Sequence, residues 1–344
     1  MLARWIDFSL EHRFLVCVLA VLLALFGVAA LPDLPLDAIP DLSDVQVIVH
    51  TDVPGSDPET VEDQVTYPIS SSLGGVPRVR DVRGFSFFGL SFVYVLFEDG
   101  TDPYWARSRV LERLSQAKRQ LPEGIEPSLG PDASGMGWVY LYTLEDTTGA
   151  LHLGELRALQ DTFVRLQLES VPGVAEVATL GGAEKRFQVT VDPRVLAALD
   201  LPLSKLVAAL KRSNADVGAR VVELAETEFM VRSRGGVESL EDLASIAFAT
   251  DAAGTPIRVR DVATCELVPD IERGIADKNG RGEVVAGIVT MRYGENALNV
   301  IDAVKAKIAE LEDGLPPGVV IEKAYDRSGL IRRSIRTLTR QLVE

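Results

Sequence analysis

Sulfur-bearing side chains are the groups in this chain best suited to chemistry with a soft metal ion. Beyond the first residue, the sequence has three methionines, Met136, Met230 and Met291, and two cysteines, Cys17 and Cys265. Thioether and thiolate sulfur prefer Cu(I) and Ag(I), whereas carboxylate and imidazole prefer harder divalent ions. Met136 is the weak candidate ligand of this set, because it leads into the second of two repeated units. Packing is the alternative interpretation for each methionine.

Harder ligands and catalytic motifs are scarce. The three histidines, His12, His50 and His152, do not have the spacing of a zinc site. Glu98 and Asp102 could hold a divalent ion, and a solvated turn is the competing interpretation of their segment "EDGTDP". The two cysteines form no CxxC pair and indicate no disulfide framework. Nucleophile elbow, P-loop, HExxH and dinucleotide patterns are all missing, which argues against an enzyme.

Length and composition indicate a folded protein of two or three domains. The chain has 344 residues, of which 47% are hydrophobic and 25% charged. The net charge of -15 argues against binding to nucleic acid through phosphate neutralisation.

An uncharged apolar segment, "FLVCVLAVLLALFGVAAL", covers residues 14–31. A helix of this length is roughly 27 Å long, close to the ~30 Å of a hydrocarbon core. The segment therefore predicts a transmembrane helix within residues 1–36; a cleaved signal peptide is the alternative. Arg4 and Arg13 precede it, and the next basic residue is Arg78. The positive-inside rule then puts the N-terminus in the cytoplasm and the bulk of the chain in the periplasm.

Two turn motifs indicate an internal repeat. The stretches "GVPRVRDVRG" at 75–84 and "SVPGVAEVATLGG" at 170–182 share the pattern Val-Pro-x-Val-x-x-Val. A second pair follows in the same order, "LPEG" from Leu121 and "LPPG" from Leu315, each after a helical stripe of apolar residues. Such sequences also end helices generically. Both pairs in one order predict a duplication.

The first unit has the predicted order β-α-β-β-α-β, a split βαβ or ferredoxin-like unit. Ser56 or Asp57 should cap its first helix, with Glu59 completing a capping box, and Pro68 should kink it. Pro103 lies near the start of the second helix. Strands are expected at 45–49, 79–87 and 91–97.

The second unit is longer by about one hundred residues, the size of a small domain. It begins with a predicted strand at 138–143, and the excess lies somewhere between Gly182 and Gly282. We therefore predict an inserted α+β domain. Its expected strands are 187–191, 221–224, 229–233 and 257–262, and its expected helices are near 203–213 and 240–244.

Several longer motifs resemble the heavy-metal efflux branch of the resistance-nodulation-division (RND) transporters. They are "PLDAIPDLSDVQVIV" (35–49), "QVTYPIS" (64–70), "FEDGTDPYWARSRVLERL" (97–114), "GPDASGMGWVY" (130–140) and "AYDRSGLIRRSI" (324–335). The resemblance covers essentially the whole chain and is nearest to the copper/silver type of inner-membrane permease.

The resemblance implies an α+β fold with a first porter subdomain at 37–131 and a second at 132–181 and 275–326. The insertion at 182–274 would be a docking subdomain, and 327–344 an amphipathic helix leading to a second span beyond the chain. The family works as a homotrimer in the bacterial inner membrane with a periplasmic adaptor and an outer-membrane channel. It exchanges protons for metal ions and needs no cofactor. Full-length members are longer, so this chain is expected to be an N-terminal portion without the proton relay or the methionine cluster, and not competent for transport alone.

The metal is open between two classes. Zinc/cobalt pumps tend to carry a Glu near Trp138, so Trp138 favours Cu(I) and Ag(I). Copper/silver pumps tend to have a Met where Ile271 stands, which leaves divalent Zn, Co or Cd as an alternative. Two further hypotheses stay open: a multidrug RND pump, and a membrane-anchored periplasmic interaction module without transport.

Overall fold

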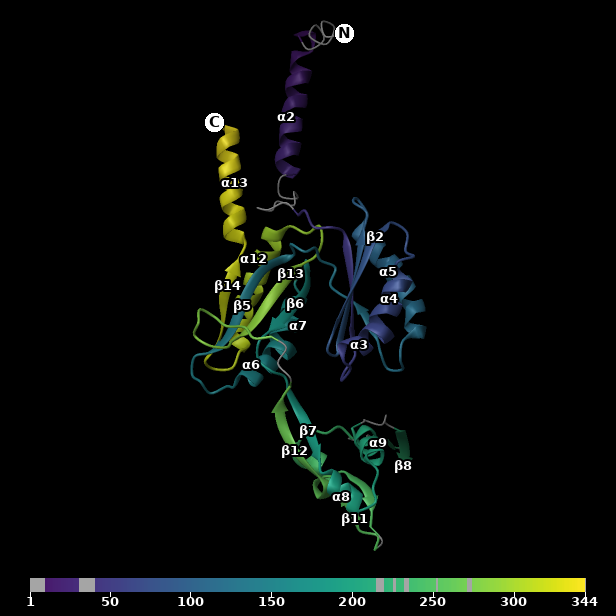
Figure 1. Cartoon of the computed structure of the whole chain (residues 1–344). Coiled ribbons are helices and arrows are strands. Elements are labelled where there is room, and N and C mark those ends of the chain that lie inside the picture. The colour runs from purple at the N-terminus through teal and green to yellow at the C-terminus, as the bar shows by residue number, and fades with distance from the viewer. Residues whose placement is uncertain are drawn as a thin grey trace. The chain divides into compact units, whose positions relative to one another are not determined.

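The chain divides into two compact units. The computed structural model describes residues 10–30, 41–214, 220–224, 227–231, 235–251, 253–270 and 274–343. The first unit comprises Met1–His152, Leu159–Gly181 and Ala276–Glu344; the second comprises Leu153–Ala158 and Gly182–Ile275 (Figure 1). The domain boundaries expected from the sequence stay predictions.

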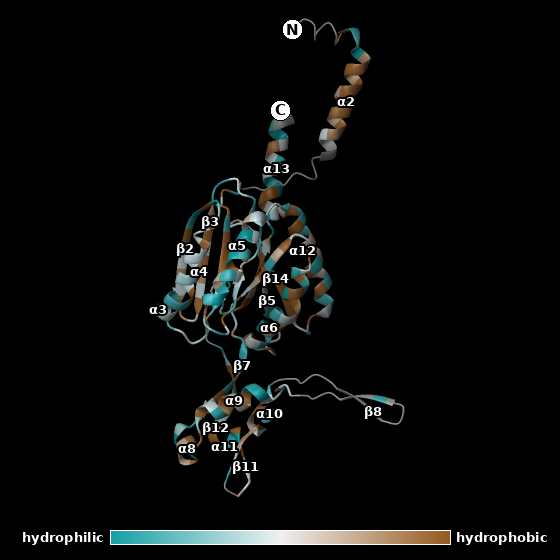
Figure 2. Cartoon of the chain, turned by 90° about the vertical axis from the view of Figure 1, so that its right-hand side faces the viewer, coloured by the Kyte–Doolittle hydropathy of each residue, from teal (hydrophilic) through white to brown (hydrophobic). Residues whose placement is uncertain are grey.

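The apolar N-terminal segment forms helix α2, Arg13–Ala30. Figure 2 shows it as hydrophobic along most of its length, and its large side chains are exposed, with Phe14 at 82% and Phe26 at 77%. Across the described ranges, no helix is both long enough and apolar enough to cross a membrane, and Leu31, the last residue of the span predicted at 14–31, lies outside them.

A four-stranded antiparallel sheet with helices on one face forms the first part of the first unit. Its strands lie in the order β2-β3-β1-β4. Alternate residues of β1, including Val47 and Val49, are buried against Ile69 and Val110 of the helices. The elements are β1 (Gln46–Asp52), α3 (Pro58–Val61), α4 (Tyr67–Leu73), β2 (Val79–Phe87), β3 (Leu90–Phe97), α5 (Pro103–Ala117) and β4 (Pro127–Leu129).

The first helix is irregular just before Pro68, where the sequence predicts a kink. It passes from α3 through a π-helical turn, Glu62–Thr66, into α4. Pro68 lies in the first turn of α4, and its missing N–H is accommodated by this wider turn. Asp57 is the N-cap and accepts from the N–H groups of Glu59 and Thr60 at 3.1 and 3.0 Å, so the carboxylate of Asp57, not a capping box with Glu59, holds the helix start.

A second antiparallel sheet in the same unit has the order β14-β5-β13-β6. Counted within its own set, the fourth strand lies beside the first, the first beside the third and the third beside the second, as in the first sheet. Both sheets therefore have the same connectivity. The elements are β5 (Trp138–Asp146), α7 (Arg165–Glu169), β6 (Val174–Leu180), β13 (Val285–Met291), α12 (Ala297–Leu311), β14 (Val319–Asp326) and α13 (Ser328–Val343). Helix α6 (Leu153–Leu159) lies between β5 and α7 in the chain, and its residues Leu153–Ala158 belong to the second unit.

The second unit is an α+β fold of its own, with a core that includes Leu196, Leu206 and Phe248. The strand predicted at 257–262 is wrong in its second half. Strand β11 ends at Arg258 and a helical turn follows, because Asp261 accepts the N–H of Arg258 at 2.7 Å and caps that turn. The elements are β7 (Lys185–Val191), α8 (Pro193–Ala198), α9 (Leu203–Ser213), β8 (Arg220–Leu224), β9 (Thr227–Val231), α10 (Leu240–Ser245), β10 (Ala247–Thr250), β11 (Pro256–Arg258), α11 (Val259–Val262) and β12 (Ala263–Pro269).

Candidate functional site

A cleft of about 590 Å³ lies in the first unit between the first sheet and strand β6. Its walls combine aromatic rings with ionisable side chains from segments far apart in the sequence. The lining residues are Ile48, His50, Phe92, Tyr94, Arg107, Leu129, Gly130, Pro131, Asp132, Ala175 and Glu176.

His50 reaches the cleft because strand β1 alternates. Val47 and Val49 are buried beneath the helices, so Ile48 and His50 lie on the opposite face of the sheet. The Nε2 atom of His50 lies 2.9 Å from the hydroxyl of Ser128 on the neighbouring strand β4. The imidazole is thereby held at the cleft wall.

Glu176 faces the same cleft from β6. Burial raises the pKa of its carboxyl above the ordinary value, and the charge of Glu169 raises it further. His50 and Arg165 act in the opposite direction but are weaker. Glu176 is thus a carboxyl that takes up a proton more readily than an exposed glutamate.

Arg107 and Asp132 fix the backbone at the base of the cleft. Arg107, on α5, donates from Nη1 to the carbonyl oxygens of Gly130 and Pro131 at 2.8 and 3.1 Å. Asp132 pairs with Arg292 at 3.5 Å. These contacts hold the segment that leads from the first sheet to the second.

Two aromatic side chains of β3 make the apolar part of the wall. Phe92 packs edge-on against Phe87 with 6.2 Å between ring centroids, and Tyr94 packs edge-on against Phe85 at 5.5 Å. Such pairs are favourable arrangements of aromatic rings.

The chemistry that this arrangement allows is weak contact with a cation. Imidazole and carboxylate are suitable ligands for divalent ions. In the parts of the chain that are described, however, no three His, Cys, Asp or Glu side chains come together as a metal-binding group. His50 and Glu176 offer an imidazole and a carboxyl group that line the cleft beside its aromatic wall.

A smaller pocket of about 100 Å³ adjoins the same segment and includes Asp41 and Asp44. Burial disfavours the charged form of Asp41, but hydrogen bonds from Ser134 and Ser43 outweigh it and lower the pKa of Asp41. Asp44 pairs with Arg80 at 2.9 Å. Both carboxylates already have partners, so this pocket is a weaker candidate for a cation.

Met136, the ligand candidate predicted from the sequence, does not line the cleft. It is half-buried just before β5, and its carbonyl oxygen accepts from Nη1 of Arg327 at 2.7 Å. Met291 lies on a neighbouring segment, where its N–H donates to the carbonyl of Gly137 at 2.7 Å. The side chain of Met230 lies outside the described residues.

The remaining residues singled out from the sequence have mostly structural contacts. Asp102 is the N-cap of α5 and accepts the N–H of Trp105 at 2.7 Å. Glu98 pairs with Arg78 at 3.6 Å. Burial raises the pKa of the Cys265 thiol, which disfavours a reactive thiolate. Ile271 lies outside the described residues, and Trp138 is 60% exposed at the start of β5.

Sequence reasoning missed His50 and Glu176 as neighbours. Each lies in an alternating strand, where a polar residue on the open face gives no functional signal by itself. The repeat was the one available signal. It predicts that the first strand of one sheet and the second strand of the other both exist, but it does not predict the distance between them.

Comparisons with known proteins find one matching family and several similar proteins. The family model described as AcrB/AcrD/AcrF matches residues 5–344. The cation efflux system protein CusA of Escherichia coli (strain K12) is 49% identical over 336 residues, which cover 98% of this chain and 32% of that relative. The cobalt-zinc-cadmium resistance protein CzcA of Cupriavidus metallidurans is 41% identical over 356 residues, covering 100% and 33%.

A solved structure gives the same picture. The crystal structure of a heavy metal efflux pump, in its crystal form II, superposes with a TM-score of 0.86 at 32% identity and covers 98% of this chain and 34% of that one. The chain thus spans about a third of the length of the proteins it matches.

Proposed function

Because the chain belongs to the AcrB/AcrD/AcrF family, we propose that it is the N-terminal part of a proton-driven pump that exports heavy-metal cations. The observation that supports this most directly is the match along 98% of the chain to a cation efflux system protein. A multidrug pump and a non-transporting interaction module have no comparable support. The proposed activity is transport, with the metal ion as substrate and the proton as coupling ion, and not enzymatic catalysis.

Cu(I) and Ag(I) are the proposed substrates. The identity to CusA, 49%, exceeds the identity to CzcA, 41%, and Trp138 stands where zinc/cobalt pumps tend to carry a Glu nearby. Ile271 stands where copper/silver pumps tend to carry a Met. Divalent Zn, Co and Cd are therefore the second candidate class, and the name of CzcA includes all three.

The proposed pump is a homotrimer at the bacterial inner membrane, joined by a periplasmic adaptor and an outer-membrane channel. The bulk of the chain would lie in the periplasm, consistent with the lack of Lys and Arg between Arg13 and Arg78. We assign a ferredoxin-like fold to each porter subdomain, on the basis of the shared strand order of the two sheets.

The cleft would act on the ion during its passage. His50 and Glu176 offer an imidazole and a carboxyl that the salt bridges of the described residues do not involve. An imidazole and a carboxylate suit divalent ions better than Cu(I) or Ag(I), so the cleft supports the second candidate class. The proton relay of the whole pump is expected in other segments.

The test is an exchange of segments. Residues 5–344 would replace the matching third of E. coli CusA in a strain that lacks its own pump, and growth would be measured in copper and silver. We expect restored resistance from the chimera and none from the chain expressed alone.

A parallel chimera in CzcA separates the two metal classes, with growth measured in zinc, cobalt and cadmium. Resistance from this chimera together with failure of the CusA chimera would assign the chain to divalent ions. Failure of both, with both proteins present in the membrane fraction at the parental level, would contradict the heavy-metal pump.

A further inference from the structure

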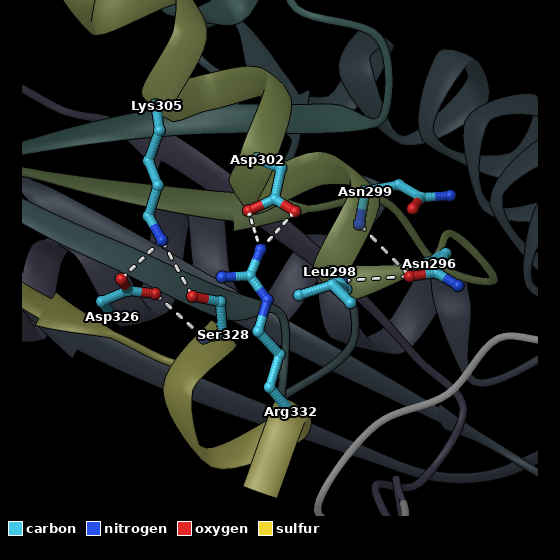
Figure 3. A network of polar contacts seen from close by, with 8 residues as sticks. All are labelled: Asn296, Leu298, Asn299, Asp302, Lys305, Asp326, Ser328 and Arg332. Atoms are coloured by element: carbon cyan, nitrogen blue, oxygen red, sulfur yellow. Dashed lines mark hydrogen bonds and ion pairs between the residues drawn. The ribbon is translucent and has the colours of Figure 1, made fainter. Parts of the chain in front are cut away.

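Helix α13 is fixed at its base to α12 by charged contacts (Figure 3). Arg332 donates from Nη2 to both carboxylate oxygens of Asp302, at 2.8 and 2.7 Å. Lys305 reaches Asp326 at 2.6 Å and Ser328 at 2.8 Å. The first turns of α13 therefore have a defined orientation on the second sheet.

An apolar stripe runs along α13 from the protein interior into solvent. Ile331 is fully buried, Ile335 is half-buried and Leu338 is 57% exposed. Their spacing of four and three residues puts them on one helix face. Past Ile335, every described side chain of α13 is exposed, so the outer part of this stripe has no cover within the described residues.

An arginine stripe lies on the other side of the same helix. Arg332, Arg336 and Arg340 are four residues apart, and Arg333 lies beside them. Residues 327–343 contain five arginines and no acidic residue, in a chain whose net charge is -15. Like charges four residues apart destabilise a helix, and an external anion would relieve this repulsion.

The apolar stripe and the arginine stripe together indicate which kind of partner fits α13. Guanidinium groups bind phosphate well, and a helix with apolar residues on one face and arginines on the other is typical of the surface of an anionic bilayer. An acidic protein surface would pair with the arginines, but its acidity would not explain the exposed apolar stripe beside them. The exposed apolar side chains of α2, such as Phe14 and Phe26, provide a second surface in the same unit suited to lipid.

We propose that the outer half of α13 binds anionic phospholipid headgroups, with Arg333 and Arg336 on the phosphates and Leu338 at the acyl boundary. This surface does not involve the transported ion, so lipid binding by α13 can be tested separately from the proposed transport.

The test measures partition of the purified full chain into vesicles of phosphatidylcholine alone and into vesicles that also contain phosphatidylglycerol. Helix α2 is uncharged after Arg13, so its binding to lipid cancels in the ratio of the two partition constants. For Arg333→Gln/Arg336→Gln we expect this ratio to fall about tenfold or more at low salt. For Arg333→Lys/Arg336→Lys, which keeps both charges, most of the preference should persist.

Two matched controls remove charge elsewhere. Arg194→Gln/Arg212→Gln takes the same charge from exposed positions in the second unit, and Arg4→Gln/Arg13→Gln takes it from the N-terminus. The first should leave the ratio unchanged, and the second should lower it by less than Arg333→Gln/Arg336→Gln does. The proposal is overturned by a ratio near one for the unmodified chain, by an unaltered ratio in Arg333→Gln/Arg336→Gln, or by an equal fall in either control.

Discussion

Arg78 and Gly173 occupy the same place in two copies of one turn, and both have a left-handed backbone, with φ of 63° and 86°. Each turn follows a Val-Pro pair and is closed by a hydrogen bond between the flanking valines, of 3.3 and 3.1 Å. This conformation favours glycine, so the first copy holds an arginine where the second has the residue that fits without cost. The repeat therefore extends to single backbone angles.

The two positions should respond oppositely to substitution. A Cβ at Gly173 would lie 2.6 Å from Cγ2 of Val300, so Gly173→Ala should lower the free energy of unfolding by about 1–3 kcal/mol. Arg78→Gly removes left-handed strain and should be neutral or stabilising by up to about 1 kcal/mol. Urea unfolding of the purified chain measures both. A Gly173→Ala variant as stable as the parent would contradict the clash.

The buried hydroxyl of Tyr142 links the second sheet to the helical segment that contains Gln160. Tyr142 donates to Oε1 of Gln160 at 3.0 Å, and both side chains are fully buried. Tyr142→Phe leaves the amide oxygen without this donor and should cost about 1–3 kcal/mol of unfolding free energy. Tyr325→Phe, at a 45% exposed position, is the control and should be near neutral. Equal effects of the two substitutions would mean that the Gln160 bond contributes nothing.

Gly287 is needed beside the same tyrosine. A Cβ at this position would lie 2.2 Å from the Tyr142 ring. Because the ring is enclosed, Gly287→Ala should destabilise the chain by about 1–3 kcal/mol, seen as a lower urea midpoint. Gly236→Ala meets no atom within 4 Å and serves as the control. The idea fails if Gly287→Ala unfolds at the parental midpoint.

Glu176 should make stability depend on pH in an unusual direction. Its folded pKa is raised above 4.5 by burial, so between the unfolded and folded pKa values the folded state binds more protons. Stability from this group is present below about pH 4.5 and is lost as pH rises through the folded pKa. Glu176→Gln should therefore gain stability relative to the parent as pH rises towards 7. A difference between the two chains that is constant with pH would refute this.

Asp326 should act in the opposite direction. Burial opposes its charge, but hydrogen bonds from Lys305 and Ser328 prevail and lower its pKa below 3.8. Its contribution is present above pH 3.8 and is lost as pH falls through the folded pKa. Asp326→Asn should thus destabilise at pH 7 and much less at pH 3, measured by urea unfolding. Asp302→Asn breaks a half-exposed pair and should cost at most about 1 kcal/mol.

Much of the fold followed from local pattern. The alternation around Val47 and Val49 and the helix at 203–213 were predicted from periodicity, and the helix stripe after Asn296 was predicted in the same way. The sequence could not predict the π-helical turns at Glu62–Thr66 and Gln160–Val164, because such turns have no simple periodic pattern. Residues 14–30 of the predicted span lie in helix α2, and no described helix is long and apolar enough to cross a membrane.

The candidate site followed far less from the sequence. His50 and Glu176 lie far apart in the sequence. They line one cleft because the segment around Asp132 joins the two sheets. Ligand chemistry directed attention to Met136, whose side chain does not line that cleft. A sequence shows which side chains could bind a metal ion. It does not show which residues on the exposed faces of two sheets come close together.

The chain leaves the first unit and returns to it at adjacent points, which affects how the second unit could be exchanged in evolution. At the boundary of the first unit, a Cβ on Gly181 would lie 3.0 Å from Ala276, so the point where the chain leaves and the point where it comes back are adjacent. Within the second unit, β7 and β12 pair directly, from Lys185 with Pro269 to Val191 with Ala263. Exchange of the segment between these points would therefore replace all of the second unit except Leu153–Ala158.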